Sequence, residues 1–273
     1  MLDPLLISYL CLGLISGLLG GMLGIGGGVI IVPALIFLFE SSGQHASHQI
    51  TLIAVATSMS CIVFTSASAA YTQYRADKVL WPIFKRMAPL FVLGSFCAGL
   101  LTPWVDASAL RAIIGLFLLL VGVVMLADWK PQPGRKLPGL PASTGIGFLG
   151  GMTAGTAGIA GGNVIVPTLI YFNVPTHNAT ATSSAMGVPI ALFGALSYAL
   201  GFQQTGDNAA SGTWMIGYID LEPWLWITIA AIITAPVGVR IAHRLPAKVL
   251  KQAFGGLLLL VAARMVYGAY QLS

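Results

Sequence analysis

Charged residues are scarce in this chain of 273 residues, where Asp, Glu, Lys and Arg together make up 8%. Hydrophobic residues make up 57%, and the mean hydropathy of +0.89 lies far above that of soluble domains. Apolar stretches recur along the whole length, too many for one signal peptide or one anchor. The composition therefore excludes an ordinary water-soluble domain and predicts a multi-pass protein of the lipid bilayer.

Cysteine is also rare, and Cys11, Cys61 and Cys97 stand singly within apolar runs. Their odd number and their spacing exclude a disulfide framework and a metal cluster, so we interpret them as packing residues. Walker motifs and nucleophile–base pairs are missing as well. We therefore expect a protein that is not an enzyme and that has no catalytic residues, no cofactor and no metal.

Basic residues give a formal net charge of +5, but they are confined to a few places. Eleven of the 13 Lys and Arg residues fall within 75–86, 130–136 and 240–251. Basic loops stay in the cytoplasm, so this clustering indicates membrane orientation and not a nucleic-acid partner. The loop 203–220 contains Asp207 and Asp220 but no basic residue, and we place it outside.

Hydrophobic segments divide the chain into ten predicted membrane elements. The second and seventh are short and follow glycines directly, so we predict half-helices or re-entrant segments there. The ten segments are 4–20, 25–39, 50–73, 83–103, 109–127, 141–157, 160–172, 179–202, 221–240 and 247–270.

Five segments in each half would invert the second half relative to the first, because five is odd. We therefore predict an all-α polytopic membrane protein made of two inverted repeats. Its parts are an N-terminal repeat (1–127), a Pro- and Gly-containing cytoplasmic linker (128–140) and a C-terminal repeat (141–273), within one integral membrane domain. Counting four segments in each half would make the halves parallel, and this alternative stays open.

An internal repeat supports the division. Residues Gly13–Phe37 align with Gly147–Tyr171 without a gap, and 12 of the 25 positions are identical. Ordinary residue frequencies would give about 2 or 3 identities over that length. In membrane proteins, paired segments interrupted by Gly and Pro indicate a substrate site between two repeats.

Each copy places glycine-rich backbone directly before a Pro-containing apolar run. Proline suits the first turn of a helix, and glycine lets another group approach the backbone. The free N–H groups at a helix start form an anion site. The alternative is that glycines four residues apart serve close helix packing alone. The predicted backbone donors to a small anion lie at Gly26, Gly27, Gly28, Gly161, Gly162 and Asn163.

Hydroxyl side chains follow each glycine segment, because Ala54–Ser58 resembles Ala179–Ser183. Hydroxyls in apolar helices often bond the carbonyl one turn back, and that interpretation stays open. Asn163, which replaces Val29 of the first copy, adds an amide that is hard to bury without a partner. The hydroxyls predicted to donate to the solute are those of Thr57, Ser58, Thr182 and Ser183.

Acidic side chains are missing from the predicted membrane interior, since all eight lie outside or at the ends of the apolar segments. We therefore expect no proton relay built from Asp or Glu. His45, His48 and His177 are interpreted as surface or loop histidines. A neutral site lined by N–H and O–H donors favours a weakly hydrated anion over a cation.

These motifs resemble the sulfite exporter TauE/SafE family, also called TSUP. The resemblance rests on Gly24–Leu35, on the Thr57–Ser58 motif, on their second copies and on His243–Lys248, and it covers essentially the whole chain. It implies a multi-pass protein of the plasma (inner) membrane that moves sulfite, thiosulfate or sulfonates such as taurine. The chain departs from the doubled glycine pattern at Ala160 and Asn163.

The residues and the resemblance together predict a secondary transporter or facilitator that alternates access between two repeats. Its partners would be a small sulfur-containing anion and the lipid bilayer. An anion-selective channel with the same donors as its filter is the main alternative. A membrane enzyme or assembly scaffold is a third, and the sequence leaves open whether the chain forms a homodimer.

Overall fold

The computed structural model of the chain describes residues 4–127, 140–201 and 214–272. These residues form ten α-helices and a short antiparallel hairpin, so the all-α multi-pass fold is confirmed. The helices are α1 (Pro4–Leu23), α2 (Gly28–Ser42), α3 (Ile50–Arg75), α4 (Trp81–Leu101), α5 (Ala107–Leu126), α6 (Leu140–Thr156), α7 (Gly162–Tyr171), α8 (Thr176–Leu200), α9 (Leu221–Ala242) and α10 (Ala247–Leu272). A 3₁₀ turn (Thr102–Trp104) follows α4, and β1 (Met215–Ile216) pairs with β2 (Ile219–Asp220) before α9.

Each of the ten predicted segments coincides with one helix, with ends that differ by a few residues. Within the described residues, six helices are long and apolar enough to cross a membrane: α1, α3, α4, α5, α8 and α9. The two segments predicted to be short are α2, with 15 residues, and α7, with 10 residues. The predicted linker 128–140 lies outside the described residues except for its last position.

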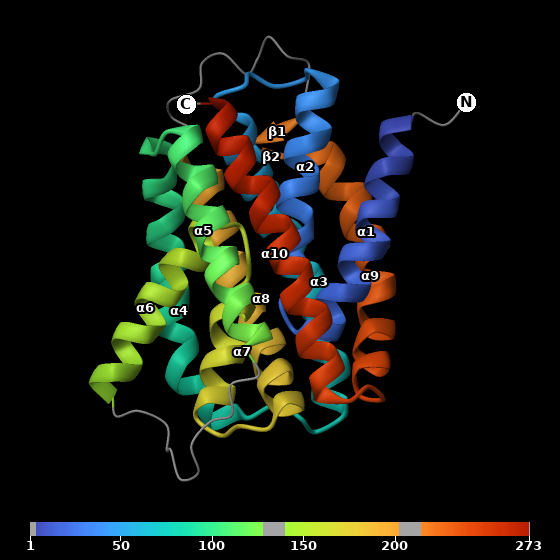
Figure 1. Cartoon of the computed structure of the whole chain (residues 1–273), viewed down its shortest axis with the longest axis vertical. Helices are drawn as coiled ribbons and strands as arrows, with labels where there is room; N and C mark the ends of the chain where they lie inside the picture. The colour runs from blue at the N-terminus through green and yellow to red at the C-terminus, as the bar shows by residue number, and fades with distance from the viewer. Residues whose placement is uncertain (1–3, 128–139, 202–213, 273) are drawn as a thin grey trace.

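The chain turns back inside the bundle at both glycine segments. In Figure 1, α1 begins at the upper end and stops part-way down, and α2 returns to the upper end. The second half takes the opposite course, since α6 begins at the lower end and α7 returns to it. An inverted repeat requires this arrangement; the division into repeats 1–127 and 141–273 and the membrane side of each end stay predictions.

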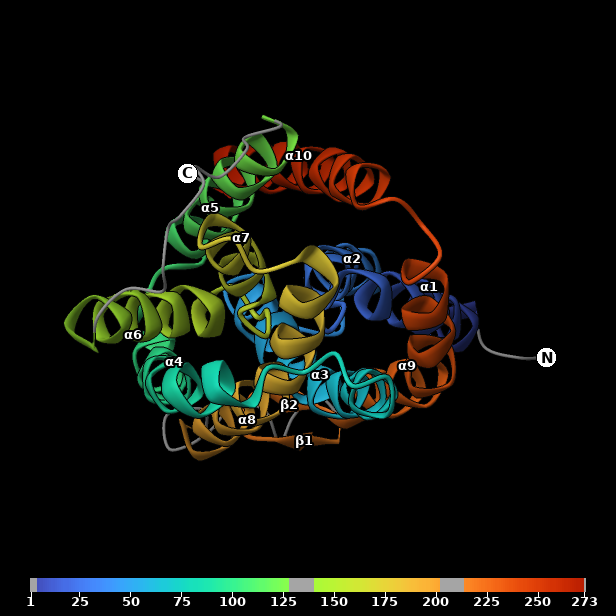
Figure 2. The same ribbon diagram turned by 90° about the horizontal axis from the view of Figure 1, so that it is seen from below.

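The main helix contacts are symmetric: each has an equivalent contact when α1–α5 are matched in order with α6–α10. Helix α1 packs on α9 and α6 packs on α4, while α3 contacts α8 and α5 contacts α10. The short helices follow the same rule, because α2 lies on α3 and α10, and α7 lies on α8 and α5. Seen from below, α2 and α7 lie within a ring formed by the longer helices (Figure 2). The two glycine segments therefore meet in the interior.

Glycines four residues apart bring helices of different halves into backbone contact. A Cβ at Gly17 would lie 2.5 Å from the Ala231 carbonyl oxygen of α9. In the second half, a Cβ at Gly155 would lie 2.9 Å from the Ser95 carbonyl oxygen of α4. The packing role of these glycines follows directly from such contacts, as small residues allow close helix approach in membranes.

Candidate functional site

The first glycine break, residues 24–27, interrupts the helical course between α1 and α2. Gly24, Gly26 and Gly27 have φ values of +72°, +72° and +87°. Residues with a Cβ rarely adopt this left-handed region, so these positions need glycine. All four residues of the break are buried. Backbone that departs from the helical conformation therefore lies inside the bundle rather than at its surface.

The second break, residues 157–161, separates α6 from α7 and has a different conformation. Gly158 and Gly161 have φ values of +68° and +75°, whereas Ala160, which aligns with Gly26, is not among the residues with positive φ. An alanine is therefore tolerated at that position. The two breaks are related in sequence and in place, but their backbone geometries are not identical.

The breaks touch each other through backbone atoms. A Cβ at Gly28 would clash with the Gly158 carbonyl oxygen, and a Cβ at Gly162 would lie 2.8 Å from the Gly24 carbonyl oxygen. The two contacts are equivalent in the two halves, because each joins the first residue of a short helix to the break of the other half. The glycine segments of the two copies are thus brought together inside the bundle.

Ser58 and Ser183 each form a hydrogen bond to the glycine break of the other half of the chain. The Ser58 hydroxyl in α3 donates to the Gly158 carbonyl at 2.9 Å, and the Ser183 hydroxyl in α8 donates to the Gly24 carbonyl at 2.8 Å. Both serines are fully buried. A hydroxyl has one hydrogen to donate, so these two are used within the protein in this structure. Both hydroxyls were predicted to donate to the solute, whereas in this structure they donate to the backbone of the breaks.

Thr57 and Thr182 each accept a hydrogen bond from the backbone just before a long helix. The Asp220 N–H, just before α9, donates to the Thr57 hydroxyl oxygen at 3.0 Å. The Leu80 N–H, just before α4, donates to the Thr182 hydroxyl oxygen at 3.0 Å. Both threonines are fully buried. They too join the halves, because each receives its bond from the other half of the chain.

Several buried N–H groups at the breaks have no acceptor. Among the hydrogen bonds that the described residues form, none uses the N–H groups of Gly26, Gly27 or Gly28 in the first break, or of Gly162 or Asn163 in the second. The predicted donor at Gly161 differs, because its N–H donates to the Ile159 carbonyl at 2.8 Å. Unpaired N–H groups at the starts of α2 and α7 favour an anion.

Asn163 is 1% exposed, and neither its amide nitrogen nor its amide oxygen has a hydrogen-bond partner within the described part of the chain. It lines a cavity of about 340 Å³ between α5, α6 and α7. Most of the other lining residues are apolar, such as Phe117, Leu149 and Val164. The side chain thus leaves polar atoms available at the start of α7.

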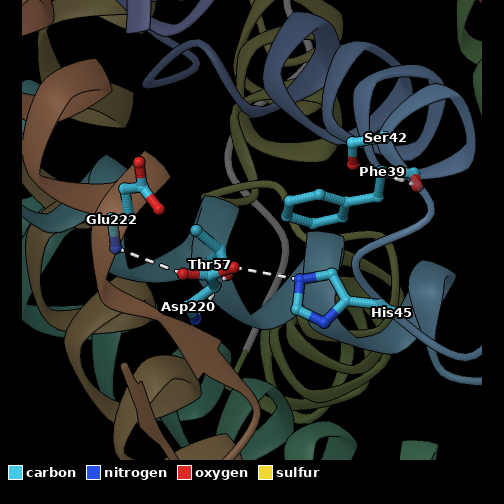
Figure 3. A network of polar contacts seen from close by, with 6 residues as sticks. All are labelled: Phe39, Ser42, His45, Thr57, Asp220 and Glu222. Carbon is cyan, nitrogen blue, oxygen red and sulfur yellow. Dashed lines mark hydrogen bonds and ion pairs between the residues drawn. The ribbon is translucent and has the colours of Figure 1, made fainter. Parts of the chain in front are cut away.

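A buried hydrogen bond between His45 and Asp220 at the upper end of the bundle was not predicted from the sequence. His45 lies in the loop between α2 and α3, as expected, but its side chain is 3% exposed instead of at the surface. Its Nε2 lies 3.0 Å from Oδ2 of Asp220, whose Oδ1 accepts the Glu222 N–H at the start of α9 (Figure 3). His45 and Asp220 are 175 residues apart, so no local pattern indicates their contact.

A second polar cluster lies where α3, α8 and α9 reach the other end of the bundle. The His243 ring packs edge-on against the His177 ring, with centroids 5.9 Å apart. His243 Nε2 donates to Gln73 Oε1 at 2.9 Å. His177 was interpreted as a surface or loop histidine; it lies in the first turn of α8.

The pKa of His243 lies below its ordinary value of 6.5, because burial and the positive charges of His177 and Lys78 disfavour the imidazolium. Folding therefore favours the neutral ring, and its contribution to stability is complete above pH 6.5 and is lost as the pH falls through the lowered pKa.

We expect the melting temperature in detergent to fall as the pH is lowered below 6.5, and to fall less in His243→Gln. The exposed His48→Gln variant should behave like wild type; equal pH profiles for all three proteins would contradict this assignment.

Comparison with known proteins identifies relatives along almost the whole chain. A model of the family described as sulfite exporter TauE/SafE matches residues 9–265. A probable membrane transporter protein of Haemophilus influenzae is 29% identical over 259 residues, which cover 94% of this chain and 97% of the relative. No solved structure matches.

Two further relatives are also named probable membrane transporter proteins. A probable membrane transporter protein of Methanocaldococcus jannaschii is 26% identical, over 92% of this chain and 90% of the relative. The probable membrane transporter protein YunE of Bacillus subtilis is 25% identical, over 94% of this chain and 95% of the relative. These names indicate a membrane transporter rather than an enzyme.

Proposed function

This chain belongs to the sulfite exporter TauE/SafE family, and from this premise we propose that it moves small sulfur-containing anions, such as sulfite, thiosulfate and sulfonates, across the plasma membrane. The observation that carries the proposal is the pair of glycine breaks, which lie in contact inside the bundle with unpaired N–H groups. In an interior of low dielectric, such donors bind a negative solute far more strongly than they would in water.

The chemistry around the breaks supports an anion held without a cationic side chain. The side chains against the first break are uncharged and come from Ser16, Ile62, Ser66 and Ala160. Those against the second are also uncharged and come from Val32, Phe91, Ile165 and Ile190. A site built from amide donors releases an anion more readily than one built from Lys or Arg, because no opposite charge must be left behind. This suits a protein that must bind and then release.

Alternating access would use the division between the halves. The hydrogen bonds of Ser58 and Ser183 join each half to the break of the other. A rocking motion of the halves would therefore move both breaks at the same time. The two glycine breaks would then be opened to one side of the membrane at a time, as in other transporters built from repeats. We assign Gly26, Gly27, Gly28, Gly162 and Asn163 to solute binding, and Thr57, Ser58, Gly161, Thr182 and Ser183 to the support of the breaks.

The test is transport by the purified protein in liposomes, with sulfite, thiosulfate, taurine and sulfoacetate offered separately. We expect saturable, protein-dependent flux of at least one of them above that of empty liposomes. Flux of none would overturn the proposal. Planar bilayers distinguish a carrier from a channel, because a carrier turns over too slowly to give unitary currents. Unitary currents would replace the carrier with an anion channel that uses the same donors.

A further inference from the structure

Ser66, in α3, carries a buried hydroxyl without a partner. The residue is 1% exposed, and its Oγ forms no hydrogen bond with any described residue. Hydroxyls in helices usually donate to a carbonyl one turn back. Its neighbour Thr65 does so, with a bond of 3.1 Å to the Cys61 carbonyl. A polar atom buried in this way is costly unless something outside the chain satisfies it.

The Ser66 hydroxyl faces the first glycine break. A Cβ at Gly26 would lie 2.7 Å from Ser66 Oγ, and a Cβ at Gly187 in α8 would lie 2.9 Å from the same atom. The hydroxyl therefore occupies the space that two glycines leave open. Gly26 is the first of three successive residues, Gly26, Gly27 and Gly28, whose N–H groups have no acceptor among the described residues. An unpaired hydroxyl thus lies against the residue at which this run of free N–H groups begins.

The space at this position is small. A Cβ at Gly26 would also lie 2.5 Å from the Ile62 side chain and 3.5 Å from the Ala160 side chain. Ala160 in turn would lie 3.2 Å from a Cβ at Gly187. These apolar groups surround the donors closely. Because even a methyl group at Gly26 would collide with Ile62 and Ser66, a solute must displace these side chains, and a compact group of oxygen atoms needs a smaller displacement than one with a carbon chain attached to it.

We propose that Ser66 is a substrate-binding residue, whose hydroxyl donates to one oxygen of a compact sulfur oxyanion while its other oxygens accept the N–H groups at the start of α2. This inference rests on the proposed function and narrows its substrate class. The solute is an inorganic anion of the size of sulfite or thiosulfate, and sulfonates with a substituted carbon chain, such as taurine, bind more weakly.

The test compares Ser66→Ala with Ser184→Ala in liposomes and by thermal shift. Ser184 is also a buried serine, 2% exposed, but it donates to the Thr180 carbonyl of its own helix at 3.1 Å. We expect Ser66→Ala to raise the half-saturating sulfite concentration about tenfold, as for the loss of one hydrogen bond to a charged group. Ser184→Ala should leave it unchanged. Without sulfite, Ser66→Ala should melt no lower than wild type, because it removes an unpaired polar group.

A second variant tests the size of the site while the Ser66 side chain is retained. Gly187→Ala adds a methyl group next to Ser66 Oγ and Ala160, and we expect it to weaken thiosulfate transport more than that of the smaller sulfite. Normal half-saturation in Ser66→Ala beside an active wild type would overturn this inference alone. Preference of the wild type for taurine over sulfite would overturn its substrate class. A wild type that transports no sulfur anion would overturn the proposed function and this inference with it.

Discussion

Replacing Gly162 by Val is expected to reduce transport to the level of empty liposomes while the protein still enters the membrane. A Cβ at this position would lie 2.6 Å from the Ile25 Cα and 2.8 Å from the Gly24 carbonyl oxygen. Both are backbone atoms of the opposite break, so they cannot rotate away as a side chain could. Valine adds two further methyl groups at the same place. The two breaks would have to separate, and the arrangement of N–H groups would be lost.

The measurement is initial transport rate per molecule of protein in liposomes, with membrane insertion checked from the amount recovered in the membrane fraction. Gly145→Val in α6 is the matched control, because no described atom outside the backbone of its own helix lies within 4 Å of a Cβ built at Gly145. It should transport like wild type. Gly28→Val should fail as Gly162→Val does, since Gly28 faces the Gly158 carbonyl in the corresponding contact. A normal rate in Gly162→Val would show that transport does not need the contact between the breaks.

Replacing Asp220 by Ala is expected to lower the free energy of unfolding by about 3 kcal/mol, because it removes one member of a buried, hydrogen-bonded pair. The variant leaves His45 Nε2 without its partner at 3.0 Å and removes the bond from the Glu222 N–H that caps α9. Both side chains are 3% exposed, so water cannot readily replace the lost contacts. The loop after α2 and the start of α9 would both be loosened.

Equilibrium unfolding in detergent measures the change, and Asp106→Ala is the control. Asp106 is also the residue before a helix, but it is exposed and its side chain forms no capping bond. It should change the free energy of unfolding by no more than about 0.5 kcal/mol. In a double-mutant cycle, His45→Ala combined with Asp220→Ala should cost less than the sum of the two single changes. Additive changes would mean that the two side chains do not stabilise each other.

Hydropathy was sufficient to predict the ten helices, because in lipid every backbone polar group must be hydrogen-bonded within its own segment. The ten apolar runs could therefore be read one at a time, and even the short α2 and α7 follow from the glycines that precede them. The internal repeat also located both breaks, because it marks the glycines that they require. Positive φ at Gly24 and Gly158 needs glycine, and such a requirement is visible in a single sequence.

Partners across the bundle could not be predicted in this way. The repeat marked Ser58 and Ser183 as a pair, but only the packing of α3 on α8 decides that each bonds the break of the other half. Ser66 was missed because it has no counterpart: eight residues after Ser58 stands Ser66, while eight residues after Ser183 stands Ala191. A search for symmetry finds what is shared and overlooks a group that only one half carries.

The crossed serine bonds also bear on biosynthesis. The Gly24 carbonyl receives its hydrogen from a serine 159 residues further along the chain. While the ribosome is still making the linker, this carbonyl has no native partner, and the early helices cannot complete their packing in the bilayer. This contact can form only after α8 has entered the membrane, so the packing of the first break is completed late in translation.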